Sequence, residues 1–544
     1  MMNEYVGEAN ERGTVQIPLP PRELTAEVSG DYTLPDYQPE IKRLLRIGVN
    51  LLPPEGITGS GVTSLTGAMD YYVLYVGRDG GIYCAPLSAE YRLEAKDEGK
   101  NEARALVGEP MTCLCDLFPD VPLGRVTAPR RLNIRCRVRA RVRPYGECPV
   151  GSETGEEDPT AESLTAVTEA GWIYQGLSEP MTLEDEVLLP PSEGETRVVC
   201  AEGRVMITEA TSLDGAVQCR GEVTVKLTLC PADPFPALMS ETATEETSPP
   251  LTVLSRKITF NHAVAVEGVT PACAATARGY CTEITVLMEE GHLHLDLGVV
   301  CEARAQENRR IAYPRDLYST RREGTYRYTD FPAEVALHAL NGNFTLSDSL
   351  PLSEAGIDPA AKVMDVTATA IPEELQSDPA KGRCVLTGQC RCQLLLWKEG
   401  EYATAETVFP FRYEFDDTPR GGPSAPPPAE DPAEPYSFAG NVTVVNCRAR
   451  MDGERFGIDA ELAVALHSSR PAPFTALTEF VPGEEVIRRS GEYVICFPAP
   501  TDTLWSVAKR YHAPMATLTA ANGLSVGGQT DGKESLAGIG YLIV

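Results

Sequence analysis

The chain has 544 residues, of which 42% are hydrophobic and 23% are charged, the composition of an ordinary globular protein. This length favours about three to five domains of roughly 100–200 residues each. Acidic residues outnumber basic ones by 78 to 48, and the resulting net charge of −30 argues against nucleic acid and against an anionic bilayer as partners.

The amino-terminal segment MMNEYVGEANERGTVQIPLPP lacks the basic region and the apolar run of a signal peptide. No apolar stretch approaches the roughly 20 residues of a membrane-spanning helix. We therefore expect a protein that is not integral to a membrane and stays in the cytoplasm of the cell that makes it. The 16 cysteines fit this expectation, because they lie in strand-like runs without a Cys-x-x-Cys motif and indicate buried free thiols.

Three segments of the chain share one layout. Each begins with a Leu-Pro pair: Leu34-Pro35, Leu189-Pro190 and Leu350-Pro351. An alternating, strand-like run follows in each copy, at 67–76, 221–230 and 388–397, and then a polar loop. The copies predict three tandem domains, at 1–150, 180–325 and 340–482, with the acidic stretch 149–163 as a hinge.

The second and third copies also contain a strand, a tight turn and a strand, with Glu290-Gly291 and Asp452-Gly453 at the turns. Val, Thr, Leu and Ile dominate the runs, and turn signals recur about every 8–12 residues, which is typical of β-sandwich domains. The sequence therefore predicts a mainly β protein made of three sandwich-like domains.

One strand of the first copy carries an unusual face. In 131–143 apolar residues alternate with arginines, so that one side of the strand is apolar and the other basic. The arginines of interest are Arg135, Arg137, Arg139, Arg141 and Arg143. Neighbouring strands and acidic loops of the chain are the favoured partners of this face. The alternative is a docking face for an acidic partner or for another copy.

The carboxyl-terminal segment 490–544 changes from strand to helix spacing. The run 491–497 alternates like a strand, and Asp502 or Thr503 is placed to cap a helix with Leu504, Val507, Ala508 and Tyr511 on one side. A second short helix follows Pro514 and ends at Asn522-Gly523. The final residues GYLIV form a strand able to pair with 492–497. A βααβ unit of this size has a small core, so we expect Leu504 and Trp505 to serve packing.

This unit resembles a LysM domain, through TDTLWSVAKRY, LTAANGL and GYLIV. Known LysM domains bind polymers of N-acetylglucosamine in a shallow groove between the first turn and the loop after the second helix. The resemblance implies that the groove is formed here by Asp502, Thr503, Leu504, Asn522, Gly523 and Leu524.

The three upstream copies resemble SPOCS domains, through EVSGDYTLPDYQPEIKRLLRIGVNL, DYYVLYV and RLNIRCRVRARV in the first copy. SPOCS repeats followed by one LysM domain are the arrangement of SipL-type spore coat morphogenesis proteins. That resemblance implies a sporulation scaffold in the mother-cell cytoplasm, at the forespore surface, where LysM holds a SpoIVA-like coat ATPase. The alternative is a protein that binds peptidoglycan of the spore cortex or cell wall. A third reading is an appendage component that self-associates through its β-domains.

No motif supports catalysis or a cofactor. Ser506-Val-Ala-Lys509 lacks the partner motifs of the acyl-enzyme hydrolases that use Ser-x-x-Lys. The segment 527–533 approaches a phosphate-binding loop, but Glu534 replaces the Ser or Thr that would bind magnesium. His467 has no identifiable acid partner, and His292-Leu-His294 has no third metal ligand nearby. We expect no enzyme, no cofactor and no metal.

Overall fold

The structure of the protein is a computed structural model. It describes residues 13–54, 56–59, 62–96, 102–107, 112–151, 153–154, 160–189, 196–231, 251–289, 291–378, 382–416, 437–487, 494–524, 536 and 539–544. Most of the polar loops predicted after the strand-like runs, as well as the amino-terminal 12 residues, lie outside these ranges. No described helix is long and apolar enough to cross a membrane.

The first β-domain is built from two sheets that share one apolar core. One sheet contains β1 (Gly13–Pro18), β2 (Arg22–Thr33), β7 (Thr112–Pro119) and β8 (Leu123–Ala128), all paired with β9 (Arg131–Val150). The other contains β3 (Ile41–Leu51), β4 (Gly56–Gly59) and β6 (Ile82–Lys96), arranged on β5 (Val62–Gly77). A short helix, α1 (Glu102–Leu106), precedes β7.

The second and third β-domains repeat this two-sheet plan. In the second domain, one sheet contains β11 (Ala161–Leu177), β12 (Met181–Leu188) and β16 (Ala274–Glu289), all paired with β17 (His292–Ser319). This sheet packs on a second one, which contains β13 (Thr196–Leu213), β14 (Ala216–Pro231) and β15 (Thr252–Ala265). The third packs β19 (Glu334–Pro351), β24 (Arg455–Pro471) and β23 (Ser437–Asp452) on β20 (Lys362–Asp378), β21 (Arg383–Lys398) and β22 (Glu401–Asp416). The expected mainly β architecture is confirmed.

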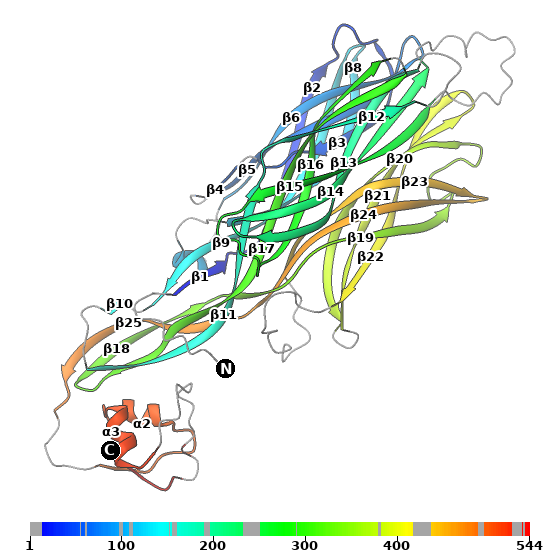
Figure 1. The fold of residues 1–544 in the computed structure, drawn as a ribbon. Helices are drawn as coiled ribbons and strands as arrows, with labels where there is room; N and C mark the ends of the chain where they lie inside the picture. The colour runs from blue at the N-terminus through cyan, green and yellow to red at the C-terminus, as the bar shows by residue number, and fades with distance from the viewer. Residues whose placement is uncertain are drawn as a thin grey trace, which may run out of the picture.

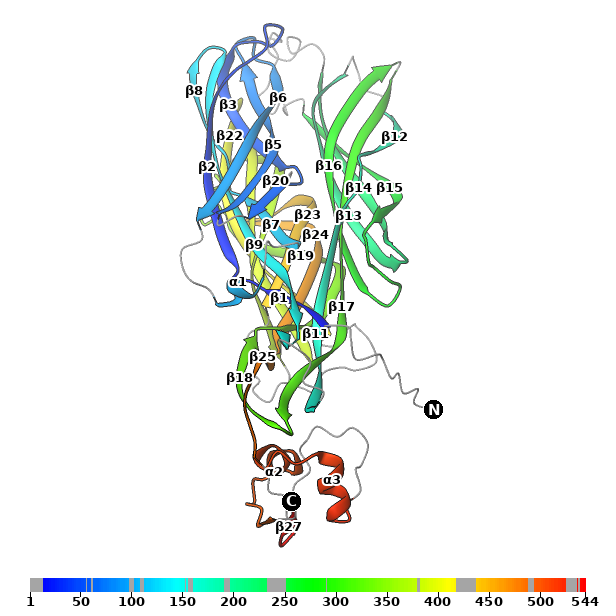
Figure 2. The same ribbon diagram turned by 90° about the vertical axis from the view of Figure 1, so that its left-hand side faces the viewer.

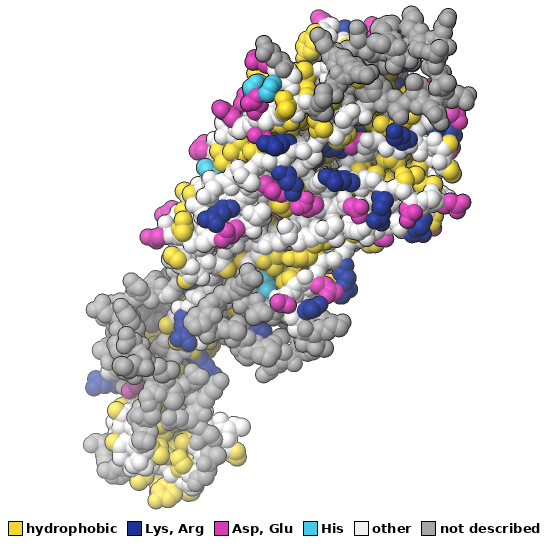
Figure 3. All heavy atoms as spheres, turned by 45° about the vertical axis from the view of Figure 1, so that its right-hand side comes forward, with side chains coloured by type: hydrophobic (Ala, Val, Ile, Leu, Met, Phe, Trp, Pro, Cys, Tyr) yellow, Lys and Arg dark blue, Asp and Glu magenta, His cyan; other side chains and the backbone are white. Residues whose placement is uncertain are grey.

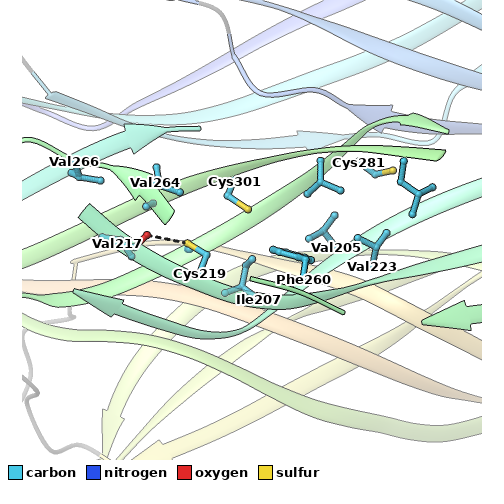
Figure 4. Packing of buried hydrophobic residues seen from close by; sticks show 14 of the residues in the cluster. Val205, Ile207, Val217, Cys219, Val223, Phe260, Val264, Val266, Cys281 and Cys301 are labelled. Carbon is cyan, nitrogen blue, oxygen red and sulfur yellow. Dashed lines mark hydrogen bonds between the residues drawn. The ribbon is translucent and has the colours of Figure 1, made fainter. Parts of the chain in front are cut away.

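Alternation along the strands produces these cores. In β14, for example, Val217, Cys219, Val223 and Val225 are fully buried in the cluster that also contains Cys301 of β17. Figure 4 shows Val217, Cys219 and Val223 in this cluster. Gly291 and Gly453 adopt φ of +86° and +58°, as the tight turns before β17 and β24 require. All 16 cysteines are described, and 13 of them are buried, as expected from their positions in strands.

A small three-stranded sheet extends the body toward the carboxyl terminus (Figure 1). We call it the stalk sheet; it contains β10 (Glu153–Thr154), β18 (Arg322–Phe331) and β25 (Phe474–Glu485). Part of the predicted hinge 149–163 is therefore strand, since Glu153 and Thr154 pair with Glu479 and Phe480. Residues 161–177, which the sequence places between two domains, form β11 and pair with β17.

The three β-domains pack side by side rather than as beads on a string (Figures 1 and 2). Equivalent strands β3, β13 and β20 each carry a bulge, at Leu45, Val199 and Met364, and these three residues meet in one interdomain apolar cluster. The body is therefore pseudo-threefold, with its equivalent strands turned toward a common axis. The sequence repeats predict three units but not this arrangement.

Buried charges from all three domains meet near that axis. Arg46 of the first domain donates to Glu202 of the second at 2.7 Å and to Asp365 of the third at 2.8 Å. In a second network, Asp116 of the first domain accepts from Arg304 of the second at 3.2 Å and from Gly440 N of the third at 2.8 Å. Such pairs are costly to break because each partner would be left charged in a dry environment.

Candidate functional site

The carboxyl-terminal module closes as the sequence predicts. Strands β26 (Ile495–Cys496) and β27 (Leu542–Ile543) pair antiparallel, and Val494 and Val544 exchange backbone hydrogen bonds of 3.3 and 2.9 Å. Two helices lie between the strands: α2 (Leu504–Arg510) and α3 (Met515–Ala521). The expected βααβ fold is confirmed for the described residues of this module.

Helix α2 begins with a capping box. The Thr503 hydroxyl accepts from Ser506 N at 3.2 Å, and Thr503 N donates to the Ser506 hydroxyl at 2.9 Å. Leu504, one residue further on, is buried in the module's core. Thr503 and Leu504 therefore hold the first turn in place, and Ser506, the serine of the Ser-x-x-Lys motif, is part of the cap.

Asp502 is also held by internal bonds. Arg510 makes a bidentate ion pair with its carboxylate, at 2.7 and 3.2 Å, and Ala499 N donates to it at 2.9 Å. The hydrogen bond from Arg510 lowers the pKa of Asp502, so the carboxylate is ionised at neutral pH. Both carboxylate oxygens are thus engaged in fixing the turn before α2.

The other groove positions follow α3. Asn522 joins the two ends of the module: its amide donates to Leu518 O and Ile543 O and accepts from Ile543 N, at 2.7–2.8 Å. Gly523 ends the helix with φ of +65°, and a Cβ built there meets open space. Leu524 packs against the core. Of the six predicted groove positions, Gly523 is the one that faces solvent with space in front of it.

The module is docked on the body through Trp505 and Lys509 of α2. Trp505 Nε1 donates to Asp316 at the end of β17 at 2.8 Å, and Lys509 forms an ion pair with the same carboxylate. Burial raises the pKa of Asp316, but the hydrogen bonds from Lys509, Trp505 and Tyr328 outweigh it and lower the pKa overall. The Asp316 carboxylate is therefore held ionised as a receptor for α2.

Tyr318 of β17 completes the docked surface. Its side chain is fully buried, its ring lies edge-on to Trp505 at 5.0 Å, and its hydroxyl donates to Ala513 O at 2.7 Å. His512 Nδ1 lies 2.7 Å from Ser319 O and its Nε2 lies 3.3 Å from Glu323. Trp505 therefore serves packing, as expected, but it packs against the body as well as within the module.

Asp316 and Tyr318 were not found by sequence reasoning. They lie in the second β-domain, 189 and 195 residues from their partners Trp505 and Ala513. Neither residue belongs to a motif, and no spacing in the chain links β17 to α2.

The outer face of the β26–β27 pair is apolar. Phe497 directly follows β26 and Tyr541 directly precedes β27, and their side chains are 76% and 57% exposed. Ile495 on the same face is 59% exposed. Hydrophobic side chains also gather on the surface of the module in Figure 3, whereas Lys, Arg, Asp and Glu are interspersed over the body. This face is the exposed apolar surface of the module.

The arginines on one face of β9 differ in their surroundings: some have partners within the chain and others are exposed. Arg139 pairs with Asp120 at 2.8 Å, Arg141 donates to Pro372 O of the third domain at 2.8 Å, and Arg143 lies 4.0 Å from Glu334. Arg135 and Arg137 are exposed. Three of these five arginines therefore have partners within the chain, including two in the third β-domain.

His467 and His292, two further candidates from the sequence, have partners within the chain. His467 is buried and contacts Thr276 and Gln306, and no carboxylate bonds to its ring. His292 pairs with Glu186. Across the described ranges, no group of three or more His, Cys, Asp or Glu is arranged to hold a metal ion. The segment that approaches a phosphate-binding loop, 527–533, lies outside the described residues.

A family model of the LysM domain matches residues 499–527. The match begins just before the turn that Asp502 fixes, contains both helices and extends past Gly523. The carboxyl-terminal module is a LysM domain. No curated protein and no solved structure matches the chain.

Proposed function

We propose that the protein is a non-catalytic binding protein that recognises peptidoglycan, through the N-acetylglucosamine polymer of its glycan strands, with its LysM domain. The match of the LysM family model to residues 499–527 carries this proposal. The groove between the first turn and the end of α3 is the binding surface, and the three β-domains form a rigid body that presents it.

The structure guides the choice of variants. Substitution of Asp502 or Asn522 breaks bonds that hold the module together, so a loss of binding there would report on folding as well as on contact. Gly523 offers a cleaner position, because a side chain there enters open space. Gly523→Asn suits the backbone, since Asn tolerates a left-handed conformation better than most residues.

The test is co-sedimentation of the full chain with insoluble peptidoglycan. We expect wild type to sediment, and Gly523→Asn to bind at least about tenfold more weakly because its side chain occupies the groove. Gly453→Asn is the matched control, since Gly453 also has a positive φ and open space in front of it but lies at the β23–β24 turn. Wild-type chain that stays in the supernatant would contradict the proposal.

A second candidate function is a sporulation scaffold of the SipL type, made in the mother cell and held at the forespore by LysM docking onto a SpoIVA-like coat protein. The apolar face with Ile495, Phe497 and Tyr541 favours it, because exposed aromatic and aliphatic side chains are typical of protein interfaces. In sporulating cells, a fluorescent fusion carrying Phe497→Asp should disperse, while Gly523→Asn should stay at the forespore. The reverse pattern would favour the glycan function.

A further inference from the structure

A cavity of about 110 Å³ lies where the three β-domains meet. Each domain contributes two equivalent strands to its wall: β3 and β7 from the first, β13 and β16 from the second, and β20 and β23 from the third. The cavity therefore lies on the pseudo-threefold axis of the body. No residue of the LysM domain lines it, so the cavity is separate from the binding surface proposed above.

Three equivalent positions line this cavity. Asn50, Arg204 and Thr369 each lie five residues after the bulged residue of their strand, so the strand register makes them counterparts in the three domains. The same structural position is therefore an asparagine in the first domain, an arginine in the second and a threonine in the third. Each of these side chains carries a hydrogen-bond donor, although the Asn50 amide also donates to Cys281 O at 2.9 Å.

The charge of the cavity wall is opposite to that of the chain. The lining residues include Arg204 and Arg278 and no Asp or Glu, although the chain carries 78 acidic residues. Arg278 is neutralised, because it pairs with Glu302 at 2.6 Å and with Asp116 at 3.4 Å. The uncompensated charge in the wall is that of Arg204.

Arg204 makes no ion pair with any described residue. Its side chain makes one hydrogen bond within that part of the chain, from Nη1 to Asn50 Oδ1 at 3.3 Å. Two carboxylates on nearby strand positions are engaged elsewhere. Glu202, two residues before Arg204, pairs with Arg46 at 2.7 Å, and Asp70, opposite Asn50 in the β3–β5 register, accepts from Ser88 at 2.7 Å. Most of the guanidinium donors of Arg204 are thus left for another acceptor.

Further donors surround Arg204. Thr369, Asn441 and Thr443 of the third domain line the same cavity, and none of their side chains bonds to another described residue. A guanidinium group surrounded by neutral hydroxyl and amide donors is suited to bind a small oxyanion. A volume of about 110 Å³ suits a single such ion.

We propose that this cavity binds one free inorganic oxyanion of the phosphate class. The ion contacts Arg204 of the second domain and donors of the third, beside Asn50 of the first. It thereby links the three β-domains at their common axis and stabilises the assembled body, because a ligand that binds only the folded state raises its stability.

The test measures thermal unfolding and isothermal titration calorimetry of the full chain with inorganic phosphate, against sodium chloride at equal ionic strength. We expect a saturable rise in Tm with phosphate and one binding site per chain. Arg204→Gln should bind phosphate at least tenfold more weakly. Arg220→Gln is the matched control, because Arg220 lies exposed on β14 of the same domain and pairs with Glu209.

A Tm rise that is equal in chloride, or that persists unchanged in Arg204→Gln, would overturn the proposal. If Arg204→Gln does not fold, Arg204→Lys decides the matter. This variant keeps the charge but loses the planar fork, so its affinity for phosphate should fall several-fold. Unchanged affinity in Arg204→Lys would likewise overturn the assignment.

Discussion

His467 illustrates how a residue of interest in the sequence acquires a structural role. It lies in β24, where its ring contacts Thr276 and Gln306 of the second domain across the interface with the third. Burial lowers the pKa of His467 to about 3, with the nearby Arg304 acting in the same direction and Glu302 against it. The imidazole is therefore neutral at physiological pH and contributes to packing.

This shift predicts a dependence of stability on pH. In the unfolded chain the pKa of His467 returns to about 6.5, so the unfolded state binds a proton that the folded state does not bind between pH 6.5 and 3. Stability should fall with decreasing pH across this window, by up to roughly 1.4 kcal/mol per pH unit from this residue. His467→Gln should remove that part of the slope in urea unfolding.

The control is the difference in unfolding free energy between wild type and His467→Gln at pH 8, because His467 is neutral there in both the folded and the unfolded state. If the unfolding free energies of the two proteins fell in parallel from pH 6 to 4, the assigned effect of burial on His467 would be contradicted.

At the scale of elements, the contact of α2 with the end of β17 determines how the LysM domain is presented. In this contact the Asp316 carboxylate of β17 bonds to Trp505 and Lys509 of α2, and the Tyr318 hydroxyl donates to Ala513 O. Hydrogen bonds to a charged acceptor contribute about 1.5–3 kcal/mol each. The LysM domain is thus held by the body and not only tethered to it.

Asp316→Ala should loosen this contact. We expect roughly tenfold or greater increases in hydrogen exchange, followed by mass spectrometry, for residues 313–320 and 504–513, since about 1.4 kcal/mol corresponds to one factor of ten. Exchange in β24 should stay unchanged. Asp330→Ala is the matched control, because Asp330 lies in the stalk sheet and bonds to Thr475 but does not touch the LysM domain. Equal exchange in wild type and Asp316→Ala would show that this carboxylate does not hold the module.

At the scale of the whole molecule, the three β-domains form one body. Their shared apolar cluster and the buried contact of Arg46 with Glu202 and Asp365 involve all three domains at once. A domain that separated from the others would expose this cluster and leave charges unpaired. The body should therefore unfold as one cooperative unit, although tandem domains in general tend to move independently.

Arg46→Met tests this cooperativity. Removing the arginine leaves two carboxylates buried beside Lys226, and we expect a loss of about 3–5 kcal/mol of unfolding free energy. Calorimetry should show the β body melting in one transition, shifted as a whole in the variant. Arg43→Met is the control, since the Arg43–Glu401 pair also joins two domains but is exposed. Separate transitions for the three domains would contradict a single unit.

Local patterns explain why much of the fold was predictable. Alternation in runs such as 221–230 identifies strands, and Asp452-Gly453 identifies a turn, because these features depend on neighbours in sequence. The same holds for the LysM module, in which the Thr503 cap, the α2 stripe and the Asn522-Gly523 terminus are each a pattern of residues close together in the chain. The repeats likewise indicated three similar units.

The sequence by itself thus determined the mainly β architecture and the βααβ module. The tertiary structure alone decided that the domains surround one axis, that Arg143 faces the third domain while Arg135 faces solvent, and that Asp316 receives the LysM domain. The physical reason is distance along the chain. The patterns that predict strands and helix caps involve residues that are close in sequence. The partners of Arg46, Arg204 and Trp505, in contrast, lie more than a hundred residues away and meet them only when the domains pack.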